Sequence, residues 1–317
     1  MTTVSILDTS ICTKNLGDNI IMDSVSNILE DVFDGSRFVN IPTHEVISKR
    51  SYELMKTSEF KIIGGSNLLA SNMNVRKQWK VGLWDSLFVD DIILLGVGWW
   101  QYQKKANPYT KILYERLFSK KHFHSVRDSY SEQQLKSIGI TNVINTSCPT
   151  VWSLTEKHCS EIPSEKSDSV LVTFTQYNQN ERFDLQLVDL LKTKYDKIYF
   201  WIQQSQDYPH MQKLCRNSAI YLKPSLKALD EFLSSHDVDY VGTRLHCGIR
   251  ALQHKKRTLI LAVDNRATEI ANDINIPVIK REDIEAIRNW IDKPYKAQIK
   301  IPQENISKWK DQFIHEA

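Results

Sequence analysis

An arginine and a histidine that could do chemistry stand two positions apart in the stretch GTRLHC, between two apolar runs of the C-terminal third. The planar guanidinium of Arg244 fits carboxylate or phosphate oxygens at two points, and the imidazole of His246 exchanges protons near neutral pH. If the preceding strand continues, the two side chains share one face and Leu245 turns to the core. The stretch therefore predicts either an anion site with a proton-transfer group, or a structural ion pair beside a core histidine.

A second arginine follows another apolar run, in HSVRDS. Arg127 comes directly after the expected strand 124–126 and before a helix, which the capping-box pair Ser129 and Glu132 would open. In α/β sheets ligands bind beyond the carboxyl ends of strands, so Arg127 is expected to face an interdomain cleft and bind an anion. A surface pair between Arg127 and Asp128, or a tie to the helix, explains the residue equally well.

Two glycine-containing turns also lie between an expected strand and an expected helix. In NLGDN, Gly17 permits a tight turn, and Asp18 either caps the helix or acts as a second acid/base group. In IIGGSNLL, backbone N–H groups at Gly65, Ser66 and Asn67 are expected to hold a phosphate or carboxylate. The second of these turns is neither a Walker loop, since no lysine follows its glycines, nor a GxGxxG fingerprint.

An aromatic cluster follows the expected strand 92–97, in GVGWWQY. The C–H face of a sugar packs well on an indole, so Trp99, Trp100 and Tyr102 are candidates for binding a glycan acceptor. Paired tryptophans after a strand are also common in cores, and we expect a core position for at least one of them.

Positioning these residues requires short buried strands that alternate with longer helices, and the sequence has this alternation. The clearest helix signals are residues 19–33, with apolar side chains on one face, and residues 129–138. Near-continuous apolar strands between helices are typical of parallel sheets covered on both faces. The expected strands are 4–7, 61–64, 92–97, 124–126, 169–174, 197–202, 240–242 and 258–263.

The chain is long enough for two domains. Residues 154–168 are polar, contain a proline and have no apolar period, so they are interpreted as a linker. We expect an N-terminal domain at 1–153 that carries Arg127, a C-terminal domain at 168–290 that carries Arg244 and His246, and a segment at 291–317 that packs back on the body.

Composition excludes several classes of protein. A net charge of +3, with lysines spread along the chain, argues against a nucleic-acid partner. Five cysteines form no CxxC, so reduced cytosolic thiols and no metal site are expected. The N-terminal residues do not read as a signal peptide, and no apolar run approaches the roughly 18 residues that span a bilayer. A cytoplasmic protein is expected.

Taken together, the motifs resemble the polysaccharide pyruvyl transferase family. The resemblance covers residues from about 10 to 270 and is carried, in order, by NLGDNI, GGSNLL, SVRDSYSEQQLKSIG and GTRLHCGIRAL with TLILAVDNR behind it. SVRD with its helix, and then RLH, are the specific parts.

The resemblance implies a fold and a reaction. The fold would be α/β, with two Rossmann-like domains whose parallel sheets face a cleft, as in GT-B glycosyltransferases. The reaction would move the enolpyruvyl unit of phosphoenolpyruvate onto two hydroxyls of a sugar and release phosphate, with phosphoenolpyruvate as co-substrate and no other cofactor. Arg127, Arg244 and His246 are implied as phosphoenolpyruvate-binding and catalytic residues. Asn15 joins the three aromatic residues on the acceptor side.

Two other functions remain open from the sequence. A GT-B glycosyltransferase that uses a nucleotide sugar would place Glu269 on ribose hydroxyls, and a non-catalytic relative would only bind glycans. The acceptor sugar and its carrier also stay open. A lipid-linked acceptor would bring the protein to the inner membrane face, which the basic runs Lys120-Lys121 and Lys255-Lys256-Arg257 would permit.

Overall fold

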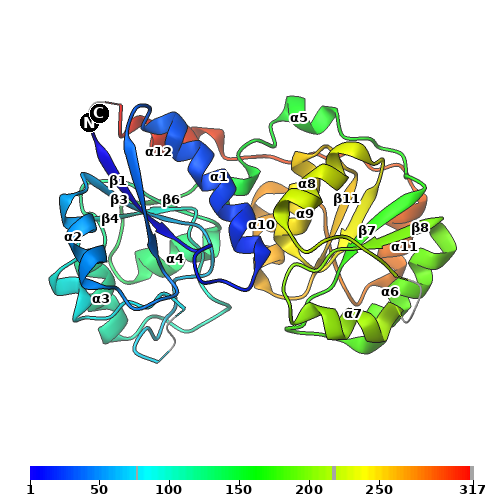
Figure 1. The fold of residues 1–317 in the computed structure, drawn as a ribbon, viewed down its shortest axis with the longest axis horizontal. Helices are drawn as coiled ribbons and strands as arrows, with labels where there is room; N and C mark the ends of the chain where they lie inside the picture. Colours follow the sequence, from blue (N-terminus) through cyan, green and yellow to red (C-terminus); the bar gives the residue numbers. More distant parts are fainter. Residues whose placement is uncertain (76–77, 216–218, 315–317) are drawn as a thin grey trace. The chain divides into compact units, whose positions relative to one another are not determined.

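The computed structural model describes residues 1–75, 78–215 and 219–314, and the chain divides into two compact units. Unit 1 comprises Met1–Thr13, Ile21–Trp152 and the C-terminal segment from Ile301 (Figure 1). Unit 2 comprises Lys14–Ile20 and Ser153–Lys300. The first turn of the first long helix is thus grouped with the second unit, although the rest of that helix belongs to the first.

The core of unit 1 is a parallel sheet in the order β2-β1-β3-β4. Its strands are β1 (Thr3–Asp8), β2 (Arg37–Pro42), β3 (Phe60–Gly64) and β4 (Ile92–Leu95). A parallel pair, β5 (His124–Val126) and β6 (Val143–Asn145), continues the arrangement through a parallel bridge between Val97 and Val126. All of β4 is buried, as expected for a central parallel strand.

The helices of unit 1 are α1 (Leu16–Val32), α2 (Lys49–Thr57), α3 (Pro108–Leu117), α4 (Ser129–Ser137) and α12 (Gln303–Asp311), with short 3-10 turns at Asp85–Leu87 and Pro149–Val151. Ile21, Val25 and Leu29 bury one face of α1, as the periodicity predicts. α12 is tied to β4 of this unit, because Trp309 is fully buried and its indole N–H donates to Leu94 O (3.1 Å).

Unit 2 is built on a six-stranded parallel sheet in the order β12-β11-β10-β7-β8-β9. Its strands are β7 (Ser169–Thr173), β8 (Lys197–Phe200), β9 (Ile220–Tyr221), β10 (Asp239–Gly242), β11 (Thr258–Ala262) and β12 (Val278–Lys280). The strand order reverses between β7 and β10. Ligands of doubly wound sheets bind at such a switch point, beyond the carboxyl ends of the two strands.

The helices of unit 2 are α5 (Glu156–Ser160), α6 (Glu181–Lys194), α7 (Asp207–Cys215), α8 (Leu226–Ser235), α9 (Leu245–Gln253), α10 (Asn265–Ile274) and α11 (Ile284–Asp292). α6 packs against α7 and α11, and α9 and α10 pack on β11. The α/β class with parallel sheets is therefore confirmed.

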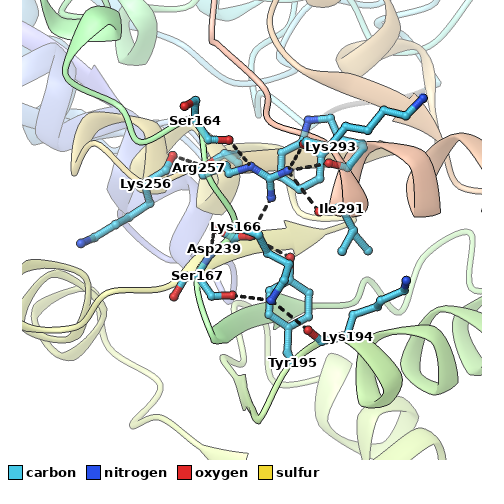
Figure 2. Close-up of polar contacts among 12 residues, drawn as sticks. Ser164, Lys166, Ser167, Lys194, Tyr195, Asp239, Lys256, Arg257, Ile291 and Lys293 are labelled. Atoms are coloured by element: carbon cyan, nitrogen blue, oxygen red, sulfur yellow. Dashed lines mark hydrogen bonds and ion pairs between the residues drawn. The ribbon is translucent and has the colours of Figure 1, made fainter.

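A buried arginine ties the segment before β7 to this sheet. Arg257, 1% exposed, donates to the carbonyl oxygens of Ser164 (3.1 Å) and Trp290 (2.5 Å) and to the Asp239 carboxylate (2.8 Å) (Figure 2). Tyr195 donates its hydroxyl proton to the same carboxylate (2.7 Å). Arg257 is therefore a structural residue and not part of an exposed basic run.

Candidate active site

The strand that leads to Arg244 stops at Gly242, and α9 begins almost at once. A Cβ at Gly242 would come within 2.5 Å of Thr173 Oγ1, so the close approach of β10 to β7 requires glycine. Arg244 is the N-cap residue of α9 and His246 lies in its first turn. The expected strand alternation of Arg244 and His246 is therefore wrong, because a helix, not a pleat, sets their directions.

Arg244 is 1% exposed, and a fully buried carboxylate balances its charge. Its Nε donates to Asp207 Oδ2 (3.0 Å), and its Nη2 donates to Asp207 Oδ1 and to Gln204 Oε1 (3.1 Å). Asp207 also accepts from the backbone N–H groups of Gln176 (2.9 Å) and Gln204 (3.0 Å). Two-point pairing fixes the plane of the guanidinium and leaves its Nη1 edge outside these contacts.

The NLGD segment lies against the loop that follows β8. Leu16 donates its N–H to Gln203 O (2.9 Å), and Gln203 Nε2 donates to Asn15 Oδ1 (2.9 Å). A Cβ on Gly17 would come within 2.7 Å of Gln203 Nε2, so glycine permits this contact. Asp18 is 5% exposed in the first turn of α1, where a negative charge is favourable. The same loop thus contacts the NLGD segment through Gln203 and Arg244 through Gln204.

In unit 1, Arg127 is held in a similar way. It is 1% exposed; its Nε donates to Asp128 Oδ2 (3.0 Å), its Nη2 is ion-paired with the same oxygen (2.9 Å), and its Nη1 donates to Asn67 Oδ1 (2.5 Å). A Cβ on Gly98 would lie 2.3 Å from Arg127 Cζ, so the guanidinium rests directly on this glycine. The pair with Asp128 exists but is buried rather than on the surface.

The expected capping box of Ser129 and Glu132 is wrong. The N-cap of α4 is Asp128, not Ser129, and its Oδ1 accepts from the backbone N–H (2.7 Å) and the hydroxyl (2.6 Å) of Ser131. One carboxylate thus begins the helix and orients Arg127.

The GGSN turn serves packing more than the sequence suggests. Gly65 and Ser66 both have positive φ, at 57° and 61°. The Gly65 N–H was expected to hold an anion, but it donates to Leu95 O (2.8 Å) and is not available for one. A Cβ on Gly65 would lie 2.2 Å from Ile21 Cγ2, which explains the glycine. Asn67, which binds Arg127, is the member of this turn that reaches the arginine.

The three aromatic candidates have different surroundings. Trp99 is fully buried, and its indole N–H donates to Gln103 Oε1 (3.0 Å), so it has no face on which a sugar could stack. Trp100 is half-buried against the core of unit 1. Tyr102 is 61% exposed and packs edge-on against Tyr130 (5.2 Å between centroids). Trp99 is therefore the core member of the pair.

Buried polar atoms without a hydrogen-bond partner in the described chain gather within three residues of strand carboxyl ends. In unit 1 they are Thr9 Oγ1 and Ser147 Oγ, and in unit 2 Thr175 Oγ1, Gln203 Oε1, Asn265 Nδ2 and Arg281 Nε; others, such as Gln134 and Trp290, lie elsewhere. Leaving such atoms without partners is costly. The carboxyl ends of the strands in each unit therefore carry the unsatisfied polar groups that a ligand-binding site would use.

Asp207, Gln204 and Gly98 are parts of these sites that the sequence motifs do not indicate. Asp207 stands in the first turn of α7, where an aspartate is expected simply to stabilise a helix start. Its partner Arg244 is 37 positions away, and no local pattern links the two.

Within residues 1–75, 78–215 and 219–314, no group of three or more His, Cys, Asp or Glu side chains is arranged to hold a metal ion. Burial raises the pKa of the Cys247 thiol, which keeps it protonated and in a packing role. Among the described helices, none combines the length and apolar character needed to cross a bilayer.

The fold is GT-B-like. The UDP-GlcNAc 2-epimerase of Methanocaldococcus jannaschii, solved with UDP-GlcNAc and UDP, superimposes with a TM-score of 0.57 at 11% identity, over 100% of this chain and 99% of the other. A second structure of that epimerase gives a TM-score of 0.56 at 11% identity, over the same shares of the two chains. S. aureus MnaA with UDP gives 0.50 at 10% identity, over 94% of this chain and 92% of the other. At these identities the likeness concerns the fold alone.

The sequence places the chain more narrowly. Residues 15–265 match the family described as polysaccharide pyruvyl transferase. This span contains the NLGD, GGSN, SVRD and RLH motifs. The chain belongs to the polysaccharide pyruvyl transferase family. No curated protein matches it in sequence.

Proposed function

We propose that this protein transfers the enolpyruvyl unit of phosphoenolpyruvate onto two hydroxyls of a sugar in a surface-polysaccharide precursor, releasing phosphate. Family membership supports a pyruvyl transferase. The observation that carries the proposal is the matched construction of Arg127 and Arg244. Each is 1% exposed, follows a strand end and is fixed by an aspartate, as a cation built to bind an anion should be.

Phosphoenolpyruvate carries a carboxylate and a phosphate, so its binding requires concentrated positive charge. Arginine supplies this charge in two-point geometry without a metal, and the charge persists at every relevant pH. Preorganised guanidinium groups in a desolvated site stabilise developing charge without reorganising. Arg127 and Arg244 are the cations assigned to the donor in this proposal.

The reaction then proceeds by proton transfer and addition. A proton adds to the methylene carbon of phosphoenolpyruvate, and cationic character develops at the carbon that bears the phosphate oxygen. One sugar hydroxyl adds there, the C–O bond to phosphate breaks, and a neighbouring hydroxyl closes the ketal. Of the two hydroxyl protons, one balances the new methyl group and the other leaves with phosphate.

His246 is the proton-transfer group in this scheme, because imidazole donates and accepts protons near neutral pH. Asp18 is assigned as a second acid/base group, since it is nearly buried in unit 2, on the segment that contacts the loop after β8. Tyr102 and Trp100 remain candidates for the acceptor, and Asn15 serves by holding the NLGD turn. No metal or further cofactor is invoked.

Ligand-dependent thermal stability separates this proposal from its rivals. A ligand that binds only the folded state raises the melting temperature. Phosphoenolpyruvate at millimolar concentration is expected to stabilise the protein, whereas stabilisation by UDP or GDP alone would favour a nucleotide-sugar glycosyltransferase. Glycan binding that survives Arg127→Ala, Arg244→Ala and His246→Ala, without any effect of phosphoenolpyruvate, would favour a non-catalytic glycan-binding protein.

A panel of acceptors would identify the sugar that receives the pyruvyl unit and the carrier to which that sugar is attached. Free hexoses, N-acetylated hexoses, nucleotide-linked sugars and lipid-linked sugars each present a different carrier. A lipid-linked acceptor that alone supports turnover would place the protein at a membrane surface. Turnover with a free or nucleotide-linked sugar would make that association unnecessary.

A further inference from the structure

A third strand-end arginine, Arg266, shares an aromatic ring with Arg244. Tyr177 follows β7, Arg244 follows β10 and Arg266 follows β11, and these strands are neighbours in the sheet of unit 2. The guanidinium carbons of Arg244 and Arg266 lie 4.9 Å and 5.1 Å from the centroid of the Tyr177 ring. Arg266 Nη2 also donates to the Tyr177 hydroxyl oxygen. Two cations are thus gathered at the switch point of the sheet.

Arg266 is constructed as Arg244 is. Its Nε and Nη2 donate to Asp264 Oδ2 (3.0 Å and 2.5 Å), just as Nε and Nη2 of Arg244 donate to Asp207. Asp264 is the N-cap of α10 and accepts the Arg266 backbone N–H (3.0 Å) as well. In both arginines the aspartate fixes the plane of the guanidinium, and Nη1 takes no part in these hydrogen bonds.

Buried polar atoms next to this pair lack partners in the described chain. Asn265, the first residue of α10, is 7% exposed and its Nδ2 has no hydrogen-bond acceptor. Thr175, two residues before Tyr177, is 1% exposed and its hydroxyl has no partner either. An amide donor and a hydroxyl are groups that commonly bind phosphate oxygens, and the start of a helix favours negative charge.

We infer that Arg266, Asn265 and Tyr177 form a phosphate subsite of unit 2 beside Arg244. Arg266 supplies the charge and Asn265 a neutral donor. Tyr177 is a positioning residue that keeps the Arg244 and Arg266 guanidiniums on one ring. The ligand of this subsite is inorganic phosphate or a phosphate monoester. The identification of that phosphate with the one carried by phosphoenolpyruvate rests on the proposed function.

Phosphate binding can be measured without turnover. Isothermal titration with inorganic phosphate, phosphoenolpyruvate and UDP is to be carried out on the wild-type full chain and on Arg266→Gln, Arg266→Lys, Tyr177→Leu and Tyr177→Phe. Arg288→Gln is the matched control, because Arg288 is 45% exposed and pairs only with Glu285 (3.8 Å) among the described residues. Circular dichroism and the melting temperature establish that each variant is folded. Arg266 is partly buried, with 17% of its side chain exposed, so the fold check is required for its variants in particular.

Loss of a charge-assisted hydrogen bond weakens binding by about ten- to a hundredfold, so Arg266→Gln is expected to reduce the affinity for inorganic phosphate and phosphoenolpyruvate by that factor. Arg266→Lys keeps the charge but loses the fork, and should fall in between. Tyr177→Leu should approach Arg266→Gln, whereas Tyr177→Phe, which keeps the ring, should lose only about two- to threefold. Arg288→Gln should bind as wild type.

The outcomes separate the subsite from the proposed function. Phosphoenolpyruvate turnover in wild type with unchanged phosphate and phosphoenolpyruvate affinity in Arg266→Gln overturns the subsite and leaves the function standing. Binding of phosphate through Arg266 without any phosphoenolpyruvate binding supports the subsite and contradicts the function. UDP binding that depends on Arg266, and exceeds that of phosphoenolpyruvate, assigns the subsite to a nucleotide phosphate.

Discussion

Asp207 holds Arg244 through two of its three guanidinium nitrogens, while both side chains are almost completely removed from solvent. The carboxylate itself is fixed by two backbone N–H groups, from the loops after β7 and β8. Three loops of unit 2 therefore converge on one ion pair. A buried pair of this kind contributes little net stability against apolar residues, but breaking it leaves a buried charge without a partner.

Asp207→Asn is therefore expected to be costly in two respects. Removal of one partner from a buried ion pair costs about 3–5 kcal/mol of unfolding free energy, measured by urea denaturation. The orientation of Arg244 is lost with it, so kcat/KM for phosphoenolpyruvate should fall at least about tenfold. Asp189→Asn is the control: Asp189 is 74% exposed and pairs with Lys192 (3.7 Å), so its removal should change stability by less than about 1 kcal/mol. Equal effects of the two substitutions would contradict this account of Arg244.

Gly98→Ala tests the position of Arg127. The new methyl group would come within 2.3 Å of Arg127 Cζ, so the guanidinium has to leave its place. Displacement of a substrate-binding group by about 1 Å can cost roughly a hundredfold in rate, and the measurement is kcat/KM for phosphoenolpyruvate. Gly35→Asn is the matched control, because Gly35 has open space around a φ of 72°, which asparagine tolerates. Full activity in Gly98→Ala would show that Arg127 need not occupy this position.

Arg257→Met tests whether the buried network in Figure 2 is structural. It removes the partner of the Asp239 carboxylate and several bonds to carbonyl oxygens, so unfolding should become easier by about 3–5 kcal/mol. Lys255→Ala removes an exposed pair with Glu161 and should leave the denaturation midpoint nearly unchanged. Chemical denaturation of both variants decides the matter, and equal midpoints would contradict the structural role.

His124, which begins β5 three residues before Arg127, makes stability depend on pH. Burial lowers the pKa of this histidine from 6.5 to about 4, although its hydrogen bond to the Ser119 carbonyl acts in the opposite direction. The unfolded chain binds a proton there at a pH where the folded protein does not. The contribution of neutral His124 to the free energy of unfolding is therefore fully present above pH 6.5 and is lost as the pH falls toward 4.

Denaturation midpoints across that range test this prediction. Between pH 7 and pH 4, wild type is expected to lose on the order of 3 kcal/mol more than His124→Gln, in which the titrating group is absent. A wild-type profile parallel to that of the variant would show that His124 is not buried in its neutral form.

The fold was predictable where strands are buried on both faces. β3, β4, β7, β10 and β11 read as apolar runs because helices cover both sides of the parallel sheets. The sequence does not reveal β2, β6, β9 or β12. In β2, β6 and β12 most residues are half-buried or exposed, and β9 has only two residues. Edge strands lack the apolar signal on which such a prediction depends.

Candidate site residues were predictable where a strand ends on an unusual side chain. Arg127 and Arg244 stand out because an arginine after an apolar run is costly without an anion. The helix start at Leu245 was missed because Arg244, its N-cap, makes no side-chain capping bond and is not a capping residue type. Asp207 and Tyr177 were missed because they reach Arg244 from other loops, and a single sequence holds no record of which loops meet.

Pyruvyl transfer is best measured by mixing the folded full chain with phosphoenolpyruvate and a panel of sugar acceptors. Inorganic phosphate is followed, and the product is examined by NMR for a new ketal methyl group. Wild type is expected to release phosphate only in the presence of a suitable sugar and to form a matching amount of ketal. Arg244→Ala and His246→Ala, both still folded, are expected to give neither product. Wild-type turnover in both variants, or stabilisation by a nucleotide with no reaction of phosphoenolpyruvate on any acceptor, would contradict the proposed function.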